Sequence, residues 1–287
     1  MNAYLLAARP KTLPAAIVPV WVGCALAYHL TGAWDGWLAF YTVMGAVWIQ
    51  IATNFFNDAI DSEKGADTDA RLGPVRATAT GRLSLKTVYV AAFVCLLLAS
   101  AFGWPLFVAR GWPMIVIAVP SFYLAYGYTG GPFPLAYKGL GELFVILFFG
   151  LVAVMGTVFV QTGVWYVQAL VAGLAIGCLS AVLIAINNLR DVDEDRLNHK
   201  RTLAVKWGRP AVLRLVWMMC LIAYTSAVWL FGSVSGLLYF LPAFIVGLLI
   251  IANIYKHLPG QIYNKFLAMA ALQLILYAVA FMLNCRV

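Results

Sequence analysis

Long apolar stretches constrain the fold of this chain more than any other feature. A helix that crosses a bilayer needs about 20 predominantly apolar residues, and nine stretches approach that length. Only 10% of the 287 residues are charged, against about 25% in soluble domains, which argues against a soluble enzyme. The runs also lack the short alternating pattern of outer-membrane barrels. Gly173 and Gly177 form a GxxxG pair that predicts close helix packing. The sequence therefore predicts an all-α polytopic membrane protein with helices at 13–30, 37–56, 88–108, 112–129, 141–161, 165–188, 211–231, 236–255 and 266–284.

Basic residues are distributed unevenly between these helices. With an inside N-terminus and alternating spans, all but Arg110 and Arg286 of the 19 Lys and Arg residues lie on one side. Basic loops mark the cytoplasmic side, so the N-terminus and the loops at about 57–87 and 189–210 are predicted to be cytoplasmic, and the chain to lie in the cell inner membrane. The net charge of +8 then needs no nucleic acid partner. An alternative, a cleaved signal peptide that includes Leu13–Cys24, leaves eight helices and the same inner loops.

The acidic residues are concentrated in two clusters, each beginning at the predicted inner end of a helix. All but Asp35 and Glu142 of the eleven Asp and Glu residues lie within 58–69 or 191–195. Carboxylates this close repel one another unless a positive group lies between them. Such hard oxygen ligands suit Mg²⁺, which commonly takes one or two carboxylates together with substrate phosphate oxygens. The alternative for each cluster is a solvated loop with charge pairs.

The spacing within the clusters places amides and carboxylates on common helix faces, because residues three and four apart lie on one side of a helix. Asn57 lies beside the first set, and Asp67 follows it as a weaker ligand candidate. Gly65 allows the chain to turn after this set. The two sets are Asn54, Asp58 and Asp61, and Asn188, Asp191 and Asp195.

Basic residues follow both acidic clusters. Arg76 follows the first cluster, and Lys200 and Arg201 follow the second. Arginine can hold phosphate oxygens in a bidentate fork. Two acidic strips flanked by basic loops at a membrane surface therefore predict a site for a metal ion and a diphosphate.

These motifs resemble those of the UbiA superfamily of membrane-bound aromatic prenyltransferases. That family carries an N-D-x-x-D motif and a D-x-x-x-D motif, which are similar to Asn57–Asp61 and Asp191–Asp195 here. The branch that prenylates 1,4-dihydroxy-2-naphthoate is the most similar, and the motifs appear in the expected order over roughly residues 7–210. Further similar segments are 8–15, 65–68, 73–76, 128–132, 139–142 and 200–204.

The resemblance implies one domain over residues 1–287, with nine helices around a central cavity and cytoplasmic caps. It implies Mg²⁺-dependent transfer of a polyprenyl group from an allylic polyprenyl diphosphate to dihydroxynaphthoate, with loss of CO₂, giving demethylmenaquinone. Another aromatic acceptor such as 4-hydroxybenzoate remains an alternative because the branches share the metal site. A secondary transporter is the alternative from another class, but its charged residues would lie near the bilayer midplane.

The resemblance also implies roles for individual residues. An equally weighted alternative for Lys11 is a membrane-surface anchor, and for Glu142 an ion pair with Lys138. Tyr128 is also open to interpretation as an interfacial aromatic residue. Direct action in catalysis is expected of Asp61, Asp191 and Arg76. Magnesium is expected to be held by Asp58, Asp61, Asp67, Asp191 and Asp195. Diphosphate or acceptor contacts are expected from Asn54, Asn57, Lys11, Asn188, Lys200, Arg201, Tyr128 and Glu142.

Overall fold

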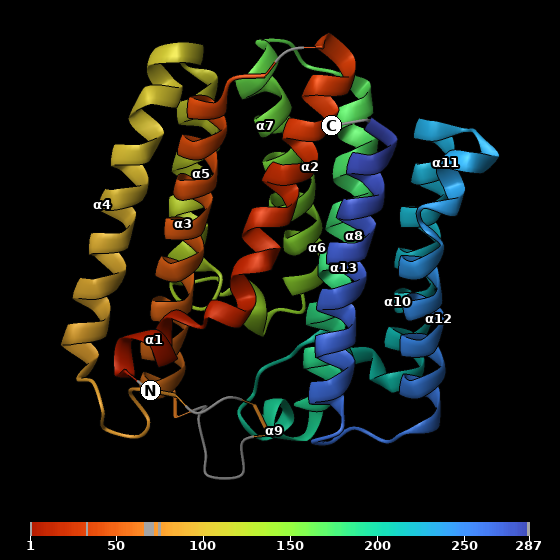
Figure 1. Cartoon of the computed structure of the whole chain (residues 1–287). Helices are drawn as coiled ribbons and strands as arrows, with labels where there is room; N and C mark the ends of the chain where they lie inside the picture. The colour runs from red at the N-terminus through yellow and green to blue at the C-terminus, as the bar shows by residue number, and fades with distance from the viewer. Residues whose placement is uncertain (1, 33, 66–71, 74–75, 286–287) are drawn as a thin grey trace.

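The chain forms a bundle of long helices that lie side by side, with both termini at the ends of the bundle (Figure 1). The computed structural model describes residues 2–32, 34–65, 72–73 and 76–285, and the elements in these ranges are all helical. The main helices are α2 (Leu13–Thr31), α3 (Gly36–Glu63), α4 (Leu85–Arg110), α5 (Pro113–Gly127), α7 (Ala153–Thr162), α8 (Val167–Arg190), α10 (Leu203–Phe231), α12 (Leu241–Lys256) and α13 (Tyr263–Cys285). Shorter segments are α1 (Ala3–Ala8), η1 (Pro10–Thr12), η2 (Leu135–Tyr137), α6 (Gly141–Val145), the π-helical η3 (Ile146–Val152), α9 (Val192–Leu197) and α11 (Val234–Leu238).

The lengths and composition of these helices agree with a membrane protein. Within the described residues, seven helices are long and apolar enough to cross a membrane, with α1–α2 and α6–α7 each taken as one, and α5 and α12 are shorter apolar helices. Each predicted apolar stretch coincides with one of these helices, so the all-α prediction is confirmed. Three boundaries differ from the prediction by more than a few residues. Helix α3, predicted to end at residue 56, ends at Glu63. The stretch 236–255 is divided into α11 and α12, and α10 begins before its span, with a non-helical kink at Gly208 (φ 74°).

Close packing of helix α8 against η3 depends on glycine. A Cβ atom on Gly177 would lie 2.6 Å from the carbonyl oxygen of Ile146, and one on Gly173 would lie 3.1 Å from that of Gly150. The two backbones therefore touch at positions where any side chain would separate them. This confirms the packing predicted from the GxxxG spacing.

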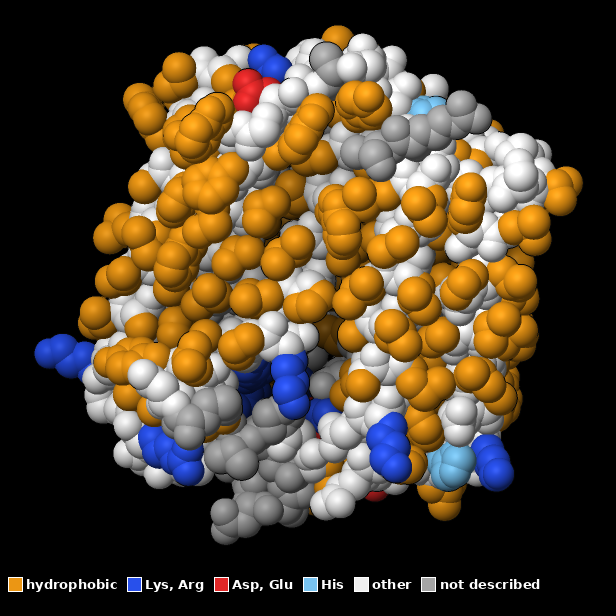
Figure 2. Space-filling model, in the orientation of Figure 1, with side chains coloured by type: hydrophobic (Ala, Val, Ile, Leu, Met, Phe, Trp, Pro, Cys, Tyr) orange, Lys and Arg blue, Asp and Glu red, His pale blue; other side chains and the backbone are white. Residues whose placement is uncertain are grey.

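The two ends of the bundle differ in charge. Figure 2 shows an apolar belt, with Lys and Arg side chains concentrated at the end that carries the N-terminus and α9. At the opposite end, Arg110 donates hydrogen bonds to the carbonyl oxygens of Val160 (2.7 Å) and Gln161 (3.0 Å) and so caps α7. The Asp35 amide donates to Gln161 Oε1 at 2.7 Å. Arg110, which was predicted on the outer side, and Asp35, which lies outside the two acidic clusters, thus both have structural partners.

Both acidic motifs lie where a long helix ends at the basic end of the bundle. Helix α3 continues through the first motif to Glu63, and Gly65 then adopts φ +65°, as expected of a glycine at a turn. The second motif, whose spacing places Asn188, Asp191 and Asp195 on one helix face, is divided between two helices, because α8 ends at Arg190 and α9 begins at Val192. The Asp195 amide still donates to the carbonyl oxygen of the residue that joins them, Asp191, at 2.8 Å. The change of direction therefore leaves these two aspartates one turn apart.

Candidate active site

Asp58 orients the loop that follows helix α3. Its side chain is buried, and its two oxygens accept hydrogen bonds from the backbone amides of Ala77 and Thr78, each at 3.1 Å. The Thr78 hydroxyl donates to the same carboxylate. Because a carboxylate oxygen can accept more than one interaction, these bonds orient Asp58 without excluding it from a ligand set. They also fix the turn that begins at Arg76.

Asp61, one helical turn further along α3, lies in a buried network. Arg76 Nη2 donates to Asp61 Oδ2 at 2.7 Å, and both residues are 5% exposed. The Tyr137 hydroxyl donates to the other oxygen at 3.0 Å. The predicted proximity of Asp61 and Arg76 is thus present, and Tyr137 joins them from a loop 76 residues away.

Asp191 is held by its neighbour in the sequence. The Arg190 guanidinium donates to both Asp191 oxygens at 2.7 Å in a bidentate fork. Arg190 also donates to Asn187 Oδ1 (2.9 Å) and to Asn264 Oδ1 on α13 (2.7 Å). Sequence reasoning counted Arg190 only among the inner positive charges, because nothing local distinguishes it from its neighbours.

Asp195 is a buried carboxylate whose charge is compensated on one side only. Lys200 Nζ lies 3.4 Å from Oδ1, while Oδ2 is buried and has no hydrogen-bond partner among the described residues. Burial raises the pKa of Asp195 from 3.8 to about 6, and the negative charge of Asp191 adds to the rise while Lys200 opposes it. A buried carboxylate with a free oxygen is a suitable position for a cation.

The two halves of the site meet at the ring of Tyr137. Lys64 Nζ lies 3.9 Å from the ring centroid and donates to the carbonyl oxygen of Thr129 at 2.7 Å. Lys200 Nζ lies 5.8 Å from the same ring. Burial lowers the pKa of Lys64, and the positive charge of Lys200 lowers it further, against the effect of Asp61. Two ammonium groups that repel each other in this way favour the binding of an anion nearby.

The side-chain amides of two asparagines on α3 hold neighbouring segments in place. Asn54 Nδ2 donates to the Ala8 carbonyl oxygen (2.8 Å) and to Thr12 Oγ1 (2.9 Å), which fixes the start of α2 against α3. Asn57 Oδ1 accepts a hydrogen bond from the Thr129 hydroxyl. Both asparagines also line the central cavity. They therefore lie between the acidic cluster and the apolar interior.

Glu142 pairs with Asn188 and not with Lys138, the alternative partner that the sequence left open. Asn188 Nδ2 donates to Glu142 Oε1 at 2.9 Å, and both side chains are buried. The second Glu142 oxygen has no hydrogen-bond partner among the described residues. Lys138 Nζ instead lies over the Phe133 ring at 5.4 Å. The Tyr128 hydroxyl is adjacent, because a Cβ atom on Gly141 would lie 3.0 Å from it.

Three predicted residues lie outside this network. Lys11 is exposed on η1, and Arg201 is exposed beside η2, with no ion pair to a described carboxylate. The Arg201 backbone amide donates to the Tyr137 carbonyl oxygen at 3.2 Å. Asp67 lies outside the residues that the structure describes. Lys64, in contrast, belongs to the network and was not selected from the sequence, and Tyr137, which the sequence favours as an interfacial aromatic residue, belongs to it as well.

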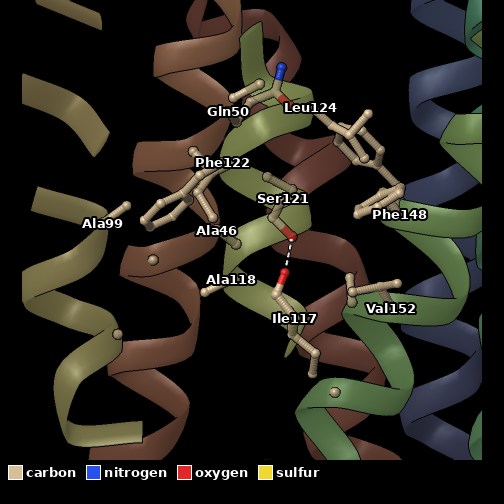
Figure 3. A pocket seen from close by; sticks show the side chains of 18 of the residues that line it. Ala46, Gln50, Ala99, Ile117, Ala118, Ser121, Phe122, Leu124, Phe148 and Val152 are labelled. Carbon is tan, nitrogen blue, oxygen red and sulfur yellow. Dashed lines mark hydrogen bonds between the residues drawn. The ribbon is translucent and has the colours of Figure 1, made fainter. Parts of the chain in front are cut away.

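An apolar cavity of about 610 Å³ extends from this cluster into the bundle. It is bounded by α2, α3, α4, α5 and the α6–α7 segment, and Asn57 and Tyr128 line it beside the acidic cluster. Figure 3 shows Phe122 of α5 directed toward Ala99 of α4, with Phe148 on the opposite side. A long apolar molecule with a polar head would fit this arrangement.

The donor set is compatible with Mg²⁺. The free Asp195 oxygen and the buried carboxylates of Asp61 and Asp191 are hard oxygen ligands. Among the described residues, no three His, Cys, Asp or Glu side chains converge as a metal cluster. Magnesium needs fewer, since it usually retains water and binds substrate phosphate oxygens.

Comparisons with known proteins agree with this site and fold. The model of the UbiA prenyltransferase family matches residues 16–283. A 1,4-dihydroxy-2-naphthoate octaprenyltransferase of Mycobacterium tuberculosis is 39% identical over 70% of this chain and 68% of its own length. One from Escherichia coli is 33% identical over 72% of this chain and 69% of its own.

Solved structures show the same fold. A UbiA homologue from Aeropyrum pernix has a TM-score of 0.74 at 15% identity and covers 96% of this chain and 98% of its own. A UbiA homologue from Archaeoglobus fulgidus, bound to DMAPP and Mg²⁺, has a TM-score of 0.62 at 16% identity, over 98% and 99%. This chain belongs to the UbiA prenyltransferase family. It is a membrane-bound prenyltransferase, and the transporter alternative is thereby set aside.

Proposed function

We propose that this protein transfers a polyprenyl group from an allylic polyprenyl diphosphate to 1,4-dihydroxy-2-naphthoate, with loss of CO₂, to form demethylmenaquinone. The relatives that carry this activity in their names support the acceptor. The observation that carries the proposal is the convergence of Asp61–Arg76 and Asp195–Lys200 around Tyr137, next to an apolar cavity that Asn54 and Asn57 of the same helix end line.

The basic residues of the cluster bind the diphosphate in this proposal. Lys64 and Lys200 both lie near the Tyr137 ring, and Arg76 supplies a planar guanidinium next to Asp61. Cations fixed in a site of low dielectric stabilise charge that develops on a leaving group. They therefore lower the barrier to breaking the allylic carbon–oxygen bond. Predicted diphosphate contacts by Arg201 and Lys11 would require their exposed side chains to turn toward the cluster.

The carboxylates would hold Mg²⁺ in this scheme, with Asp61, Asp191 and Asp195 as the principal residues and Asp58 as a further ligand. When bound, magnesium would neutralise the diphosphate and assist its departure. Asp67, which lies outside the described residues, remains a weaker candidate. The hydrogen bonds from Ala77 and Thr78 already hold Asp58 in a fixed orientation.

The cavity would exclude water from the allylic cation and receive the aromatic acceptor. Tyr128 and Asn57 line it next to the acidic cluster, where the acceptor hydroxyls would meet them. The paired Glu142 and Asn188 lie adjacent, and we assign them to positioning this end of the cavity. A ring carbon of the acceptor attacks the cation, and the carboxylate of the acceptor leaves from that carbon as CO₂.

The dimensions of the cavity suggest where a long prenyl chain would leave. The lining runs along α3 from Thr42 to Asn57, about 22 Å at 1.5 Å per residue, and an isoprene unit extends roughly 5 Å at ordinary bond lengths. About four extended units would therefore fit. Among the described lining residues, the exposed ones are Ser100, Trp104 and Ile115 on α4 and α5. Longer chains would leave into the lipid at that point.

We further propose that the chain is one domain of nine membrane crossings in the cell inner membrane, with the N-terminus and the active-site loops in the cytoplasm. The gathering of basic side chains at one end supports this orientation. Single cysteines introduced as Lys86→Cys and Trp112→Cys test it. An impermeant thiol reagent applied to spheroplasts should label only the second, and labelling of the first would reverse the orientation.

A product assay on purified protein tests the proposed activity. Polyprenyl diphosphate and Mg²⁺ are supplied with 1,4-dihydroxy-2-naphthoate or, in parallel, with 4-hydroxybenzoate. The expected product is a decarboxylated prenyl naphthol from the first acceptor, lost on addition of EDTA. Asp61→Asn and Asp191→Asn should abolish turnover, whereas Asp193→Asn, on a side chain that is 87% exposed, should retain it. Product formed only from 4-hydroxybenzoate would show that this compound, and not dihydroxynaphthoate, is the acceptor. Full turnover in both active-site variants would refute the metal site.

A further inference from the structure

A second basic pocket lies beside the candidate active site, on the other side of the loop that carries Tyr137. Its volume is about 270 Å³. The loop 132–138 provides one wall, and the chain between α9 and the first turn of α10 provides the other. The lining residues are Pro132, Pro134, Tyr137, Lys138, His199, Arg201 and Lys206.

Backbone contacts hold the two walls together. The Arg201 amide donates to the Tyr137 carbonyl oxygen at 3.2 Å, and Lys206 Nζ donates to the Lys138 carbonyl oxygen at 2.6 Å. Gly139 has φ +70°, and a Cβ atom there would lie 2.9 Å from the Arg201 carbonyl oxygen. The approach of the two loops therefore requires a glycine, and the pocket between them has a defined shape.

The charges of this pocket are not compensated by protein. Three of its seven lining residues are Lys or Arg, a fourth is His199, and none is acidic. Among the described residues, no carboxylate forms an ion pair with Lys138, Arg201 or Lys206; the nearby Asp195 pairs with Lys200 instead. Cations gathered without a counter-charge favour the binding of an anion.

We propose that this pocket binds a phosphate group. An arginine fork together with lysine point charges is a combination that recognises phosphate oxygens. The phosphate could be that of an anionic lipid headgroup, because basic pockets at the cytoplasmic surface bind such headgroups, or that of free phosphate or diphosphate. The absence of carboxylates from the lining distinguishes this pocket from the catalytic site: its ligand needs no Mg²⁺.

The test uses the full-length protein without Mg²⁺, donor or acceptor, in EDTA, so that failure of the proposed enzyme activity does not affect it. In one arm, isothermal titration measures inorganic phosphate in an uncharged detergent. In the other, native mass spectrometry measures phosphatidylglycerol retained from nanodiscs of phosphatidylcholine and phosphatidylglycerol. The pocket variant is Lys138→Gln with Arg201→Gln, whose side chains are exposed. The matched control is Lys86→Gln with Arg214→Gln, which are exposed elsewhere at the same end.

Each basic side chain near an anionic headgroup contributes about fivefold in affinity, so the pocket variant should lose about 25-fold while the control changes little. Loss confined to the titration arm assigns the pocket to a free anion, and loss confined to the nanodisc arm assigns it to a lipid headgroup. Equal loss in both double variants would mean a diffuse surface effect and would overturn the proposal. Absence of binding in both arms would overturn it as well.

Discussion

The substitution Asp195→Asn is expected to make the metal-free protein more stable while it removes activity. Asp195 is 5% exposed, one of its oxygens has no hydrogen-bond partner, and burial raises its pKa from 3.8 to about 6. The folded state therefore binds the proton more tightly than the unfolded state does. Stability from this group is fully present below pH 3.8 and is lost as the pH rises through about 6.

The size of the effect follows from that pKa difference. At about 1.4 kcal/mol for each pH unit, ionising Asp195 costs roughly 3 kcal/mol of folding free energy above pH 6. The neutral amide of Asn avoids this cost. For a chain of this size, roughly 3 kcal/mol corresponds to an increase in Tm of roughly 5–10 °C.

Thermal unfolding in detergent with EDTA, at pH 5 and pH 8, measures the effect. The variant should unfold at a higher temperature than the wild type at pH 8, and this gain should fall to about half at pH 5, which lies between the unfolded pKa of 3.8 and the folded pKa of about 6. Asp193→Asn is the matched control, since its side chain is 87% exposed and pairs only with Arg196 on the surface. It should change neither temperature.

Three outcomes would contradict this reasoning. A variant less stable than the wild type at pH 8 would mean that the pair with Lys200 outweighs the burial of the carboxylate. A gain that is the same at pH 5 and pH 8 would show that it does not arise from ionisation. A loss of turnover without any change in stability would leave Asp195 a catalytic residue but remove the argument that it is uncompensated.

Three further predictions concern the ion pair, the packing and the cavity. Arg76→Ala should lower the free energy of unfolding by about 3–5 kcal/mol, because it leaves Asp61 buried without its cationic partner. Arg82→Ala, on an exposed side chain of the same loop, should change the Tm little. Equal shifts in Tm for the two variants would contradict this. Gly177→Ala should cost about 1–3 kcal/mol through overpacking against Ile146 and lower the yield of monodisperse protein, whereas Gly45→Ala, with open space around it, should not. Ser100→Trp should slow long donors more than geranyl diphosphate in turnover assays, while Leu97→Trp, on the lipid side of the same helix, should slow neither; a uniform loss would refute the proposed exit.

The sequence determined the helices, the concentration of acid at two helix ends and the family. These are local or periodic properties: the length of an apolar run sets a membrane helix, and spacings of three and four place residues on one helix face. Asn54, Asp58 and Asp61 are all buried on α3 for this reason. The same rule failed at Asp191, because the chain leaves the helix there, and the hydrogen bond that keeps Asp195 near it is visible only in the folded chain.

The tertiary structure alone decided which partner each polar group has. Asp61 meets Tyr137 across 76 residues, Arg190 meets Asn264 across 74, and Glu142 meets Asn188 rather than Lys138. Pattern reasoning finds charged groups but does not choose among cations of similar spacing, because the choice depends on how distant helix ends pack. The free energy of a buried charge depends on that packing, and so the uncompensated state of Asp195 could be known only from the fold.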